Sequence, residues 1–129
     1  MFTGIVQTKG KILNINSTQE GLSILVGVPT SFNKDLQRGA SVAVNGVCLT
    51  VTKKSKEKIS FDVIKETLRS TNLSRLNQLD EVNMERSLKF GDEVGGHLLS
   101  FHISCDCHLT LTHYIGLVVL VVSKPTRCV

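Results

Sequence analysis

The feature that most constrains the fold of this chain is an Asn-Gly pair set between two short apolar runs. Asn45-Gly46 follows residues 41–44 (Ser-Val-Ala-Val) and precedes residues 47–51 (Val-Cys-Leu-Thr-Val). Because Asn and Gly both tolerate positive φ, the pair favours a two-residue turn between antiparallel strands. The sequence therefore predicts a β-hairpin here, and we expect Ser41 and Cys48, one on each side of the turn, to lie across from one another.

Similar short runs lie on both sides of this hairpin. Ile59, Phe61 and Val63 alternate with polar residues, a pattern typical of a strand with one buried face. Residues 65–73 change period and indicate a short helix. The other expected strands begin at Ile5-Val6 and cover residues 11–16, 22–28 (ended by Pro29) and 82–86. Short strands at regular spacing with one short helix predict an all-β fold, a small closed antiparallel barrel.

Length and composition exclude several classes of protein. The 129 residues suit one domain, and the net charge of +4 is modest and spread out. The lysines of residues 53–58 lack aromatic neighbours, so we expect a solvated loop and no nucleic-acid partner. Residues 114–122 are apolar but too few to cross a bilayer. No basic export signal opens the sequence, so we expect a cytoplasmic protein with free thiols and no membrane partner.

Six segments, in this order, are similar to one known family. They are residues 1–6 (Met-Phe-Thr-Gly-Ile-Val), 41–51, 61–69, 71–73, 82–86 and 95–100 (Gly-Gly-His-Leu-Leu-Ser). Together they resemble the first half of riboflavin synthase. The resemblance implies a six-stranded antiparallel Greek-key barrel with a short helix, a unit that this family carries twice in each chain.

The resemblance also implies a reaction. Riboflavin synthases dismutate two molecules of 6,7-dimethyl-8-ribityllumazine by exchanging a four-carbon unit, giving riboflavin and a ribitylamino-uracil. No metal and no separate cofactor are implied. The active site of the family lies between the first barrel of one chain and the second barrel of a neighbour. We therefore expect a small-molecule substrate and a homo-oligomer, a dimer for a single barrel and a trimer for a complete two-barrel chain.

The resemblance stops abruptly after Ser100. The family has Gly-His at the next two positions, where this chain has Phe101-His102. Residues 99–103 echo residues 2–6, as the start of a second repeat would. We expect a lumazine-binding barrel over residues 1–97, and a stub of a second repeat with an unmatched tail over residues 98–129. The alternatives are a truncated or frame-shifted synthase, favoured by the abrupt end, and a stand-alone binding barrel.

Three segments of the chain correspond to the ligand contacts of the family. A flat heterocycle with a ribityl chain needs backbone groups at a strand edge and small hydroxyls. Glycine allows close backbone approach, and residues two apart on a strand share a face. The residues expected to bind substrate are Gly4, Ile5, Val6, Cys48, Leu49, Thr50, Asp62, Val63, Ile64, Lys65, Glu66 and Thr67.

Four residues are candidates for the chemistry, which removes a proton from an acidified methyl group and adds a nucleophile to the ring. Ser41 and Cys48 could act as polarised nucleophiles, although Cys48 could equally be a small buried residue. His97 and His102 fall where the family has histidines at the junction of its repeats, and either could move a proton near neutral pH.

Two other readings of the sequence need separate tests. Cys105, Cys107 and His108 lack the paired spacing of a zinc site, so we expect no metal.

As alternatives to a synthase, the barrel could be a non-catalytic carrier of lumazine or flavin, or a barrel that binds oligonucleotides. An aromatic content of 5% and the absence of Trp argue against the oligonucleotide binder. A carrier would bind flavin without converting lumazine.

Overall fold

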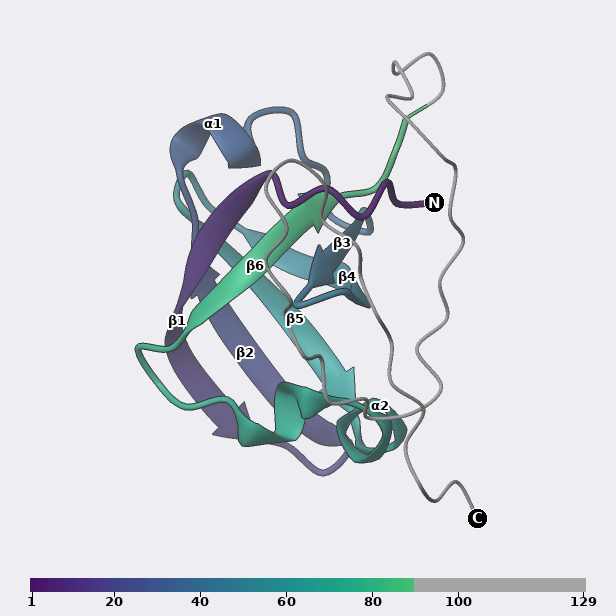
Figure 1. The fold of residues 1–129 in the computed structure, drawn as a ribbon. Helices are drawn as coiled ribbons and strands as arrows, with labels where there is room; N and C mark the ends of the chain where they lie inside the picture. Colours follow the sequence, from purple (N-terminus) through teal and green to yellow (C-terminus); the bar gives the residue numbers. More distant parts are fainter. Residues whose placement is uncertain (90–129) are drawn as a thin grey trace, which may run out of the picture.

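Residues 1–89 are the part of the chain that this computed structural model describes, and they form a closed antiparallel barrel (Figure 1). The strands are β1 (Thr8–Ser17), β2 (Gly21–Gly27), β3 (Ser41–Val44), β4 (Val47–Lys54), β5 (Lys58–Ile64) and β6 (Glu81–Arg86). The helical elements are α1 (Thr30–Asn33), α2 (Lys65–Ser70) and the 3-10 turn η1 (Asn72–Arg75). The predicted all-β class, a six-stranded antiparallel barrel, is confirmed.

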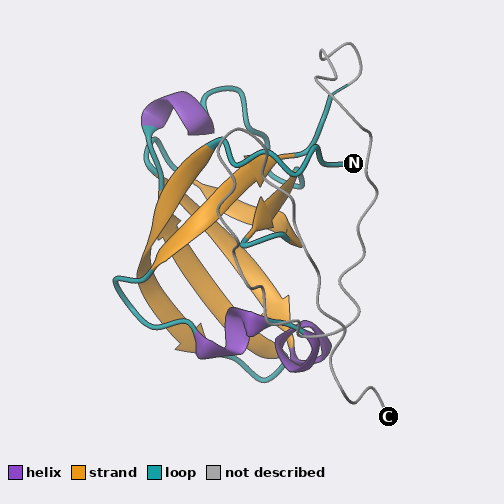
Figure 2. Cartoon of the chain, viewed as in Figure 1, coloured by secondary structure: helices purple, strands orange, loops and turns teal. Residues whose placement is uncertain are grey.

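The order of strands around the barrel is β1-β2-β5-β4-β3-β6, and β6 pairs back onto β1. β3, β4 and β5 are successive neighbours, whereas β2 crosses over to lie beside β5, which is a Greek-key connection. Figure 2 shows the strands forming the wall of the barrel and the helical elements lying near its ends. The Greek-key topology implied by the resemblance is therefore the one observed.

The turn between β3 and β4 has the predicted geometry. Asn45 and Gly46 have φ values of 49° and 81°, both in the left-handed region. Val44 and Val47 are paired directly across this two-residue turn. The Asn45 side chain also fastens the turn to β6, because the N–H of Asn83 donates to its Oδ1 at 2.8 Å. The turn residues thus set the register of β3 against β4 and help to place β6.

The interior of the barrel is filled by apolar residues from alternate strand positions. In β5, Ile59, Phe61 and Val63 are all buried, as their spacing predicts. Phe32 of α1 and Leu73 of η1 join the same core from elements near opposite ends of the barrel (Figure 1). Because the interior is occupied by these side chains, residues that could bind a polar ligand are the outward-facing ones.

The structure corrects the expected start of the first strand. Ile5 and Val6 are exposed and precede the strand, which begins at Thr8. The reason is a turn: the Ile5 N–H donates to Oγ1 of Thr3 at 3.1 Å, and Gly4 has a φ of 80°. Pairing with β6 starts only at Thr8, opposite Met84.

The helical prediction is correct in place but not in continuity. The expected helix over residues 65–73 is divided into α2 and η1 by the extended Thr71, whose φ is −139°. The Thr71 hydroxyl donates to the carbonyl of Thr67 at 2.7 Å and accepts from the N–H of Leu73 at 3.4 Å. This side chain replaces the backbone bonds that a continuous helix would make.

Two further differences concern the segment after β2. Sequence periodicity gave no sign of α1, a single helical turn that follows Pro29. The lysine stretch is also not entirely a solvated loop, because the Lys54 ammonium donates to the carbonyls of Asn33 at 3.2 Å and Leu36 at 2.6 Å. Lys54 thus holds the loop after α1 against β4.

None of the helices in residues 1–89 has the length and apolar content needed to cross a membrane.

Candidate functional site

Two parallel rows of residues cross the outer face of the barrel, one from β6 to β5 and the other from β3 to β2. In the first, Ala43 of β3 pairs with Glu85 of β6 on one side and with Cys48 of β4 on the other. Counted on from the pair Val51 and Phe61, Ile64 of β5 comes level with Cys48, and Ile64 is 57% exposed. We call Glu85, Ala43, Cys48 and Ile64 the Cys48 row.

The second row lies two residues along the strands from the first and is polar. Ser41 of β3 pairs with Thr50 of β4, and Asp62 of β5 pairs with Ser23 of β2. Thr50 and Asp62 lie next to the last paired residues of β4 and β5, Val51 and Phe61, and both line one hollow. We call Ser41, Thr50, Asp62 and Ser23 the Thr50 row.

A hollow of about 670 Å³ lies over one end of the Thr50 row. Ser23, Thr50 and Asp62 contribute to its lining, together with Ser60 and Arg38. Its remaining lining residues are Gly39, Val51, Thr52 and Lys53. Hydroxyls, one carboxylate and two cations therefore converge on one surface of the barrel.

The paired register of β4 and β5 does not extend to either row. Their ladder ends at the pair Val51 and Phe61, so residues 47–50 and 62–64 have no register partner across this gap. The Lys65 N–H donates to the Glu20 carbonyl on the β2 side. Because peptide groups alternate in direction along a strand, the backbone groups of Ile64 point the other way, toward β4. The gap thus supplies the strand-edge groups that a heterocycle can use.

The first seven residues, which we call the N-terminal segment, lie along β6 beside the Cys48 row (Figure 1). Glu85 faces outward, since its neighbour Met84 is in the core, yet it is only 7% exposed. Its Oε1 accepts from the N–H and the hydroxyl of Thr3 and from the N–H of Gly4. Gly4 itself is open, because a Cβ added there would meet nothing within 4 Å.

The sequence analysis placed Ser41 and Cys48 across from one another, and this is wrong by two residues. Ser41 lies opposite Thr50, and Cys48 lies opposite Ala43. The two-residue turn fixes this register, because Val44 must face Val47. Cys48 is a free and exposed thiol, so its alternative role as a small buried residue is excluded.

The remaining predicted binding residues fall into two groups. Leu49 and Val63 point into the core, so only their backbone can meet a ligand. Lys65, Glu66 and Thr67 follow directly after Ile64 in α2, at the end of the same strand. The predicted His97 and His102 lie outside the described residues, as do Cys105, Cys107 and His108.

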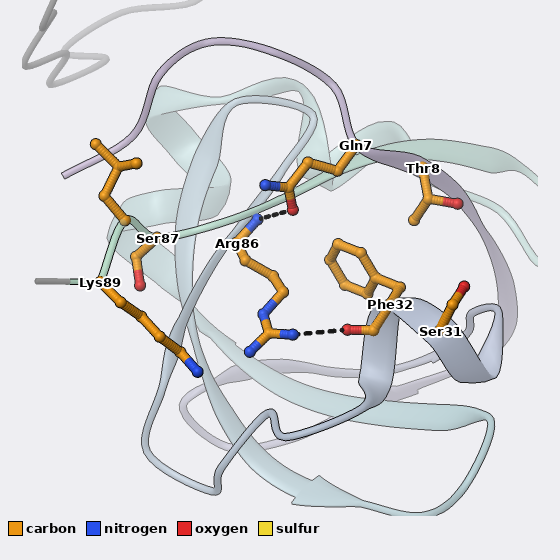
Figure 3. A pocket seen from close by; sticks show the side chains of 8 residues that line it. Gln7, Thr8, Ser31, Phe32, Arg86, Ser87 and Lys89 are labelled. Atoms are coloured by element: carbon orange, nitrogen blue, oxygen red, sulfur yellow. Dashed lines mark hydrogen bonds between the residues drawn. The ribbon is translucent and has the colours of Figure 1, made fainter. Parts of the chain in front are cut away.

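A second hollow of about 470 Å³ contains none of the predicted residues (Figure 3). The N–H of Arg86 donates to Oε1 of Gln7 at 3.0 Å, and its guanidinium donates to the carbonyl of Phe32 at 3.3 Å. Figure 3 shows the Arg86 side chain lying between Gln7 and Phe32. None of its lining residues belongs to either row, so this hollow is separate from the site assembled above.

Sequence reasoning missed three contributors to the site. Ser23 and Arg38 reach it only through the crossover of β2 and the loop after α1, and Glu85 reaches it only through the N-terminal segment. Alternation in β2 could have marked Ser23 as outward, but no local signal links Glu85 to Thr3, 82 positions away. Within residues 1–89, no group of three or more His, Cys, Asp or Glu side chains could hold a metal ion.

Comparison with known proteins identifies the family to which this barrel belongs. The family model of the lumazine binding domain matches residues 3–87, which contain all six strands and both rows. The chain belongs to the lumazine-binding domain family. The predicted resemblance to riboflavin synthase is also confirmed: the Escherichia coli riboflavin synthase is 50% identical over 103 residues, and that of Chlamydia pneumoniae is 47% identical over the same length.

These alignments cover 80% of this chain and 48% and 52% of the two synthases, so the chain spans about half the length of the curated relatives it matches. Among solved structures, LumP complexed with riboflavin has a TM-score of 0.67 and 29% identity, covering 74% of this chain and 51% of that one. LumP complexed with 6,7-dimethyl-8-(1'-D-ribityl) lumazine has a TM-score of 0.63 and 29% identity, covering 67% and 49%. The fold and the family are thus supported by both sequence and structure.

Proposed function

We propose that this lumazine-binding barrel binds 6,7-dimethyl-8-ribityllumazine and riboflavin on its outer face, at the two rows. The heterocycle lies along the Cys48 row, against Gly4 and the unpaired strand edges of β4 and β5. The ribityl chain lies along the Thr50 row, where Thr50 and Asp62 receive its hydroxyls. The names of the related synthases and the two LumP complexes support this class of ligand.

The observation that carries the proposal is the division of one face into two chemically different halves. A ribityl-lumazine is a flat ring joined to a chain of hydroxyls, and each half needs a different surface. The Thr50 row presents three hydroxyls and one carboxylate, whereas the Cys48 row presents the apolar Ile64 and lies beside the open backbone at Gly4. The two rows are two residues apart on β4, which is about 7 Å along a strand.

We propose further that the barrel contributes to riboflavin synthesis by holding one of the two lumazines that are dismutated. Ser41 and Cys48 are the described groups that could serve the reaction as nucleophiles, and His97 and His102 are the proposed proton carriers. A second ligand has to come from another barrel, so we expect a homo-oligomer. The cytoplasm, where a free thiol such as Cys48 persists, is the expected compartment.

A carrier that binds the same ligands without turnover is the second candidate. It is favoured by the likeness to LumP, whose solved complexes contain lumazine, riboflavin and flavin mononucleotide. The two candidates differ only in chemistry, and both require the same binding face.

Fluorescence titration tests whether the chain binds riboflavin, which both candidate functions require. We expect riboflavin emission to change on addition of the purified chain and to saturate at one ligand per chain. Release of riboflavin on incubation with 6,7-dimethyl-8-ribityllumazine would then identify the enzyme, because a carrier converts no lumazine. No change in emission at high micromolar protein would overturn both candidates.

A further inference from the structure

Glu85 is the one described residue whose side chain connects the barrel wall to the middle of the N-terminal segment. The two ends of this segment are attached by backbone bonds: the Leu88 N–H donates to the Met1 carbonyl at 2.9 Å, and the Gln7 N–H donates to the Met84 carbonyl at 3.0 Å. Between these ends, residues 3 and 4 are fastened by the Glu85 carboxylate.

The bonds to Glu85 determine the direction of the backbone where a ligand would meet it. One oxygen, Oε1, accepts the Thr3 hydroxyl at 2.8 Å and the Gly4 N–H at 3.0 Å, as well as the Thr3 N–H. The Thr3 hydroxyl in turn accepts the Ile5 N–H at 3.1 Å. This chain of bonds holds three successive peptide units, and Ile5 is 57% exposed.

The position of Glu85 on the barrel ties this segment to the site. Glu85 pairs with Ala43, and Ala43 pairs with Cys48, so all three share one register row. Neighbouring strands are about 4.8 Å apart, which places the backbone of Glu85, whose side chain holds Gly4, roughly 10 Å from that of Cys48 across β3. A flat ligand lying on the Cys48 row would therefore have Cys48 at one end and the Gly4 backbone at the other.

We propose that Glu85 is a positioning residue, which holds Gly4 and Ile5 in the conformation that contacts the bound heterocycle. This role rests on the proposed function, because it presupposes a ligand on the Cys48 row. Glu85 acts through the N-terminal segment and does not itself touch the ligand. A charged acceptor forms stronger hydrogen bonds than a neutral one, so the carboxylate suits this task better than an amide.

The test is a set of variants with riboflavin affinity and thermal stability measured together. Glu85→Ala should weaken riboflavin binding about tenfold, and Glu85→Gln, which keeps a neutral acceptor, about threefold. Thr3→Val removes the hydroxyl and should also cost about threefold. Combining Glu85→Ala with Thr3→Val should weaken binding by less than the product of the two single effects, since both changes break the bond between the Thr3 hydroxyl and the Glu85 carboxylate.

Glu81→Gln is the matched control, because Glu81 is an exposed glutamate on the same strand that pairs only with the exposed Lys9 among the described side chains, at 2.9 Å. Its riboflavin affinity should equal that of the unchanged chain. In the free protein, the amides of Gly4 and Ile5 should exchange with deuterium faster in Glu85→Gln than in Glu81→Gln, while exchange in the strands is unaltered.

Each outcome decides the question. A Glu85→Gln chain that loses thermal stability but keeps full affinity would show a purely structural role and overturn the proposal. Unchanged exchange at Gly4 and Ile5 would overturn it as well. Failure of the unchanged chain to bind riboflavin would instead overturn the proposed function, and is distinguished from these results because it does not depend on Glu85.

Discussion

At the scale of single residues, the proposed site consists of side chains that the barrel does not use for its own packing. Thr50 and Asp62 are exposed and point away from the core. Thr50→Val should therefore weaken riboflavin binding by about 3- to 10-fold, the value of one lost hydrogen bond, and leave the free energy of unfolding nearly unchanged. Fluorescence titration and urea denaturation measure the two quantities. Thr18→Val, an exposed threonine in the turn after β1, is the control, and equal effects in both variants would contradict the site.

Asp62→Asn should have the larger effect of the two site variants. A carboxylate accepts stronger hydrogen bonds from ligand hydroxyls than an amide oxygen does, so we expect a loss of roughly 10-fold or more. The same titration measures it, with lumazine and riboflavin as separate ligands. If affinity rose on removal of the charge, the ribityl chain would not lie against Asp62.

Gly21, at the start of β2, pairs with Ile64 at the edge of the site. It has a φ of 153°, and a Cβ added there would lie 2.0 Å from the carbonyl oxygen of Val63. Gly21→Ala should destabilise the barrel by about 3 kcal/mol, because backbone on both sides must shift. Gly39→Ala, where a Cβ meets nothing within 4 Å but φ is 87°, should cost about 1 kcal/mol. Urea denaturation compares them, and equal losses would contradict the close approach of β2 and β5.

At this scale, the sequence predicts a residue's orientation when neighbouring residues determine it, and fails when distant residues do. Cys48 and Thr50 are two positions apart on a strand, so their shared outward face follows from alternation alone. The residues that face them on β3 depend on the length of the turn. Ser41 faces Thr50 and not Cys48, because the turn has two residues. Glu85 could not be found, since its importance comes from contacts with Thr3 and Gly4 at the other end of the described chain.

At the scale of elements, the hairpin of β3 and β4 is the best determined part of the fold. Asn45 serves it twice, by adopting positive φ and by accepting the Asn83 N–H at 2.8 Å. Asn45→Ala should lower the free energy of unfolding by about 2 kcal/mol, because it loses the bond and strains the turn. Asn45→Asp keeps an acceptor and tolerates the same φ, so it should lose less than half as much. Equal losses in urea denaturation would show that the bond to β6 does not matter.

The elements that the sequence failed to predict are those held by tertiary contacts. α1 is one turn long and depends on Lys54, Arg86 and a buried Asn33 that donates to the carbonyls of Ser55 and Lys56. No periodicity can develop over so few residues. The N-terminal segment has strand-like composition at Ile5 and Val6, but its pairing is prevented by the turn that Thr3, Gly4 and Glu85 impose.

At the scale of the whole molecule, residues 1–89 form one barrel with one candidate binding face. The dismutation needs two lumazines face to face, and holding both close together accounts for much of the expected rate. Two copies of one barrel would pair about a two-fold axis, which need not set donor against acceptor. We therefore expect weak or absent riboflavin formation, rising more than linearly with protein concentration. Riboflavin release over a hundred-fold range of protein measures this, and fast release proportional to protein would contradict it.

The most direct test of the proposed binding face is its mapping by NMR. Riboflavin added to the uniformly ¹⁵N-labelled chain should shift the backbone amide resonances of Gly4, Cys48, Thr50, Asp62 and Ile64. Amides around the second hollow, such as those of Ser31 and Phe32, should not move. Shifts confined to that hollow, or spread evenly over the barrel, would contradict a ligand on the Cys48 and Thr50 rows.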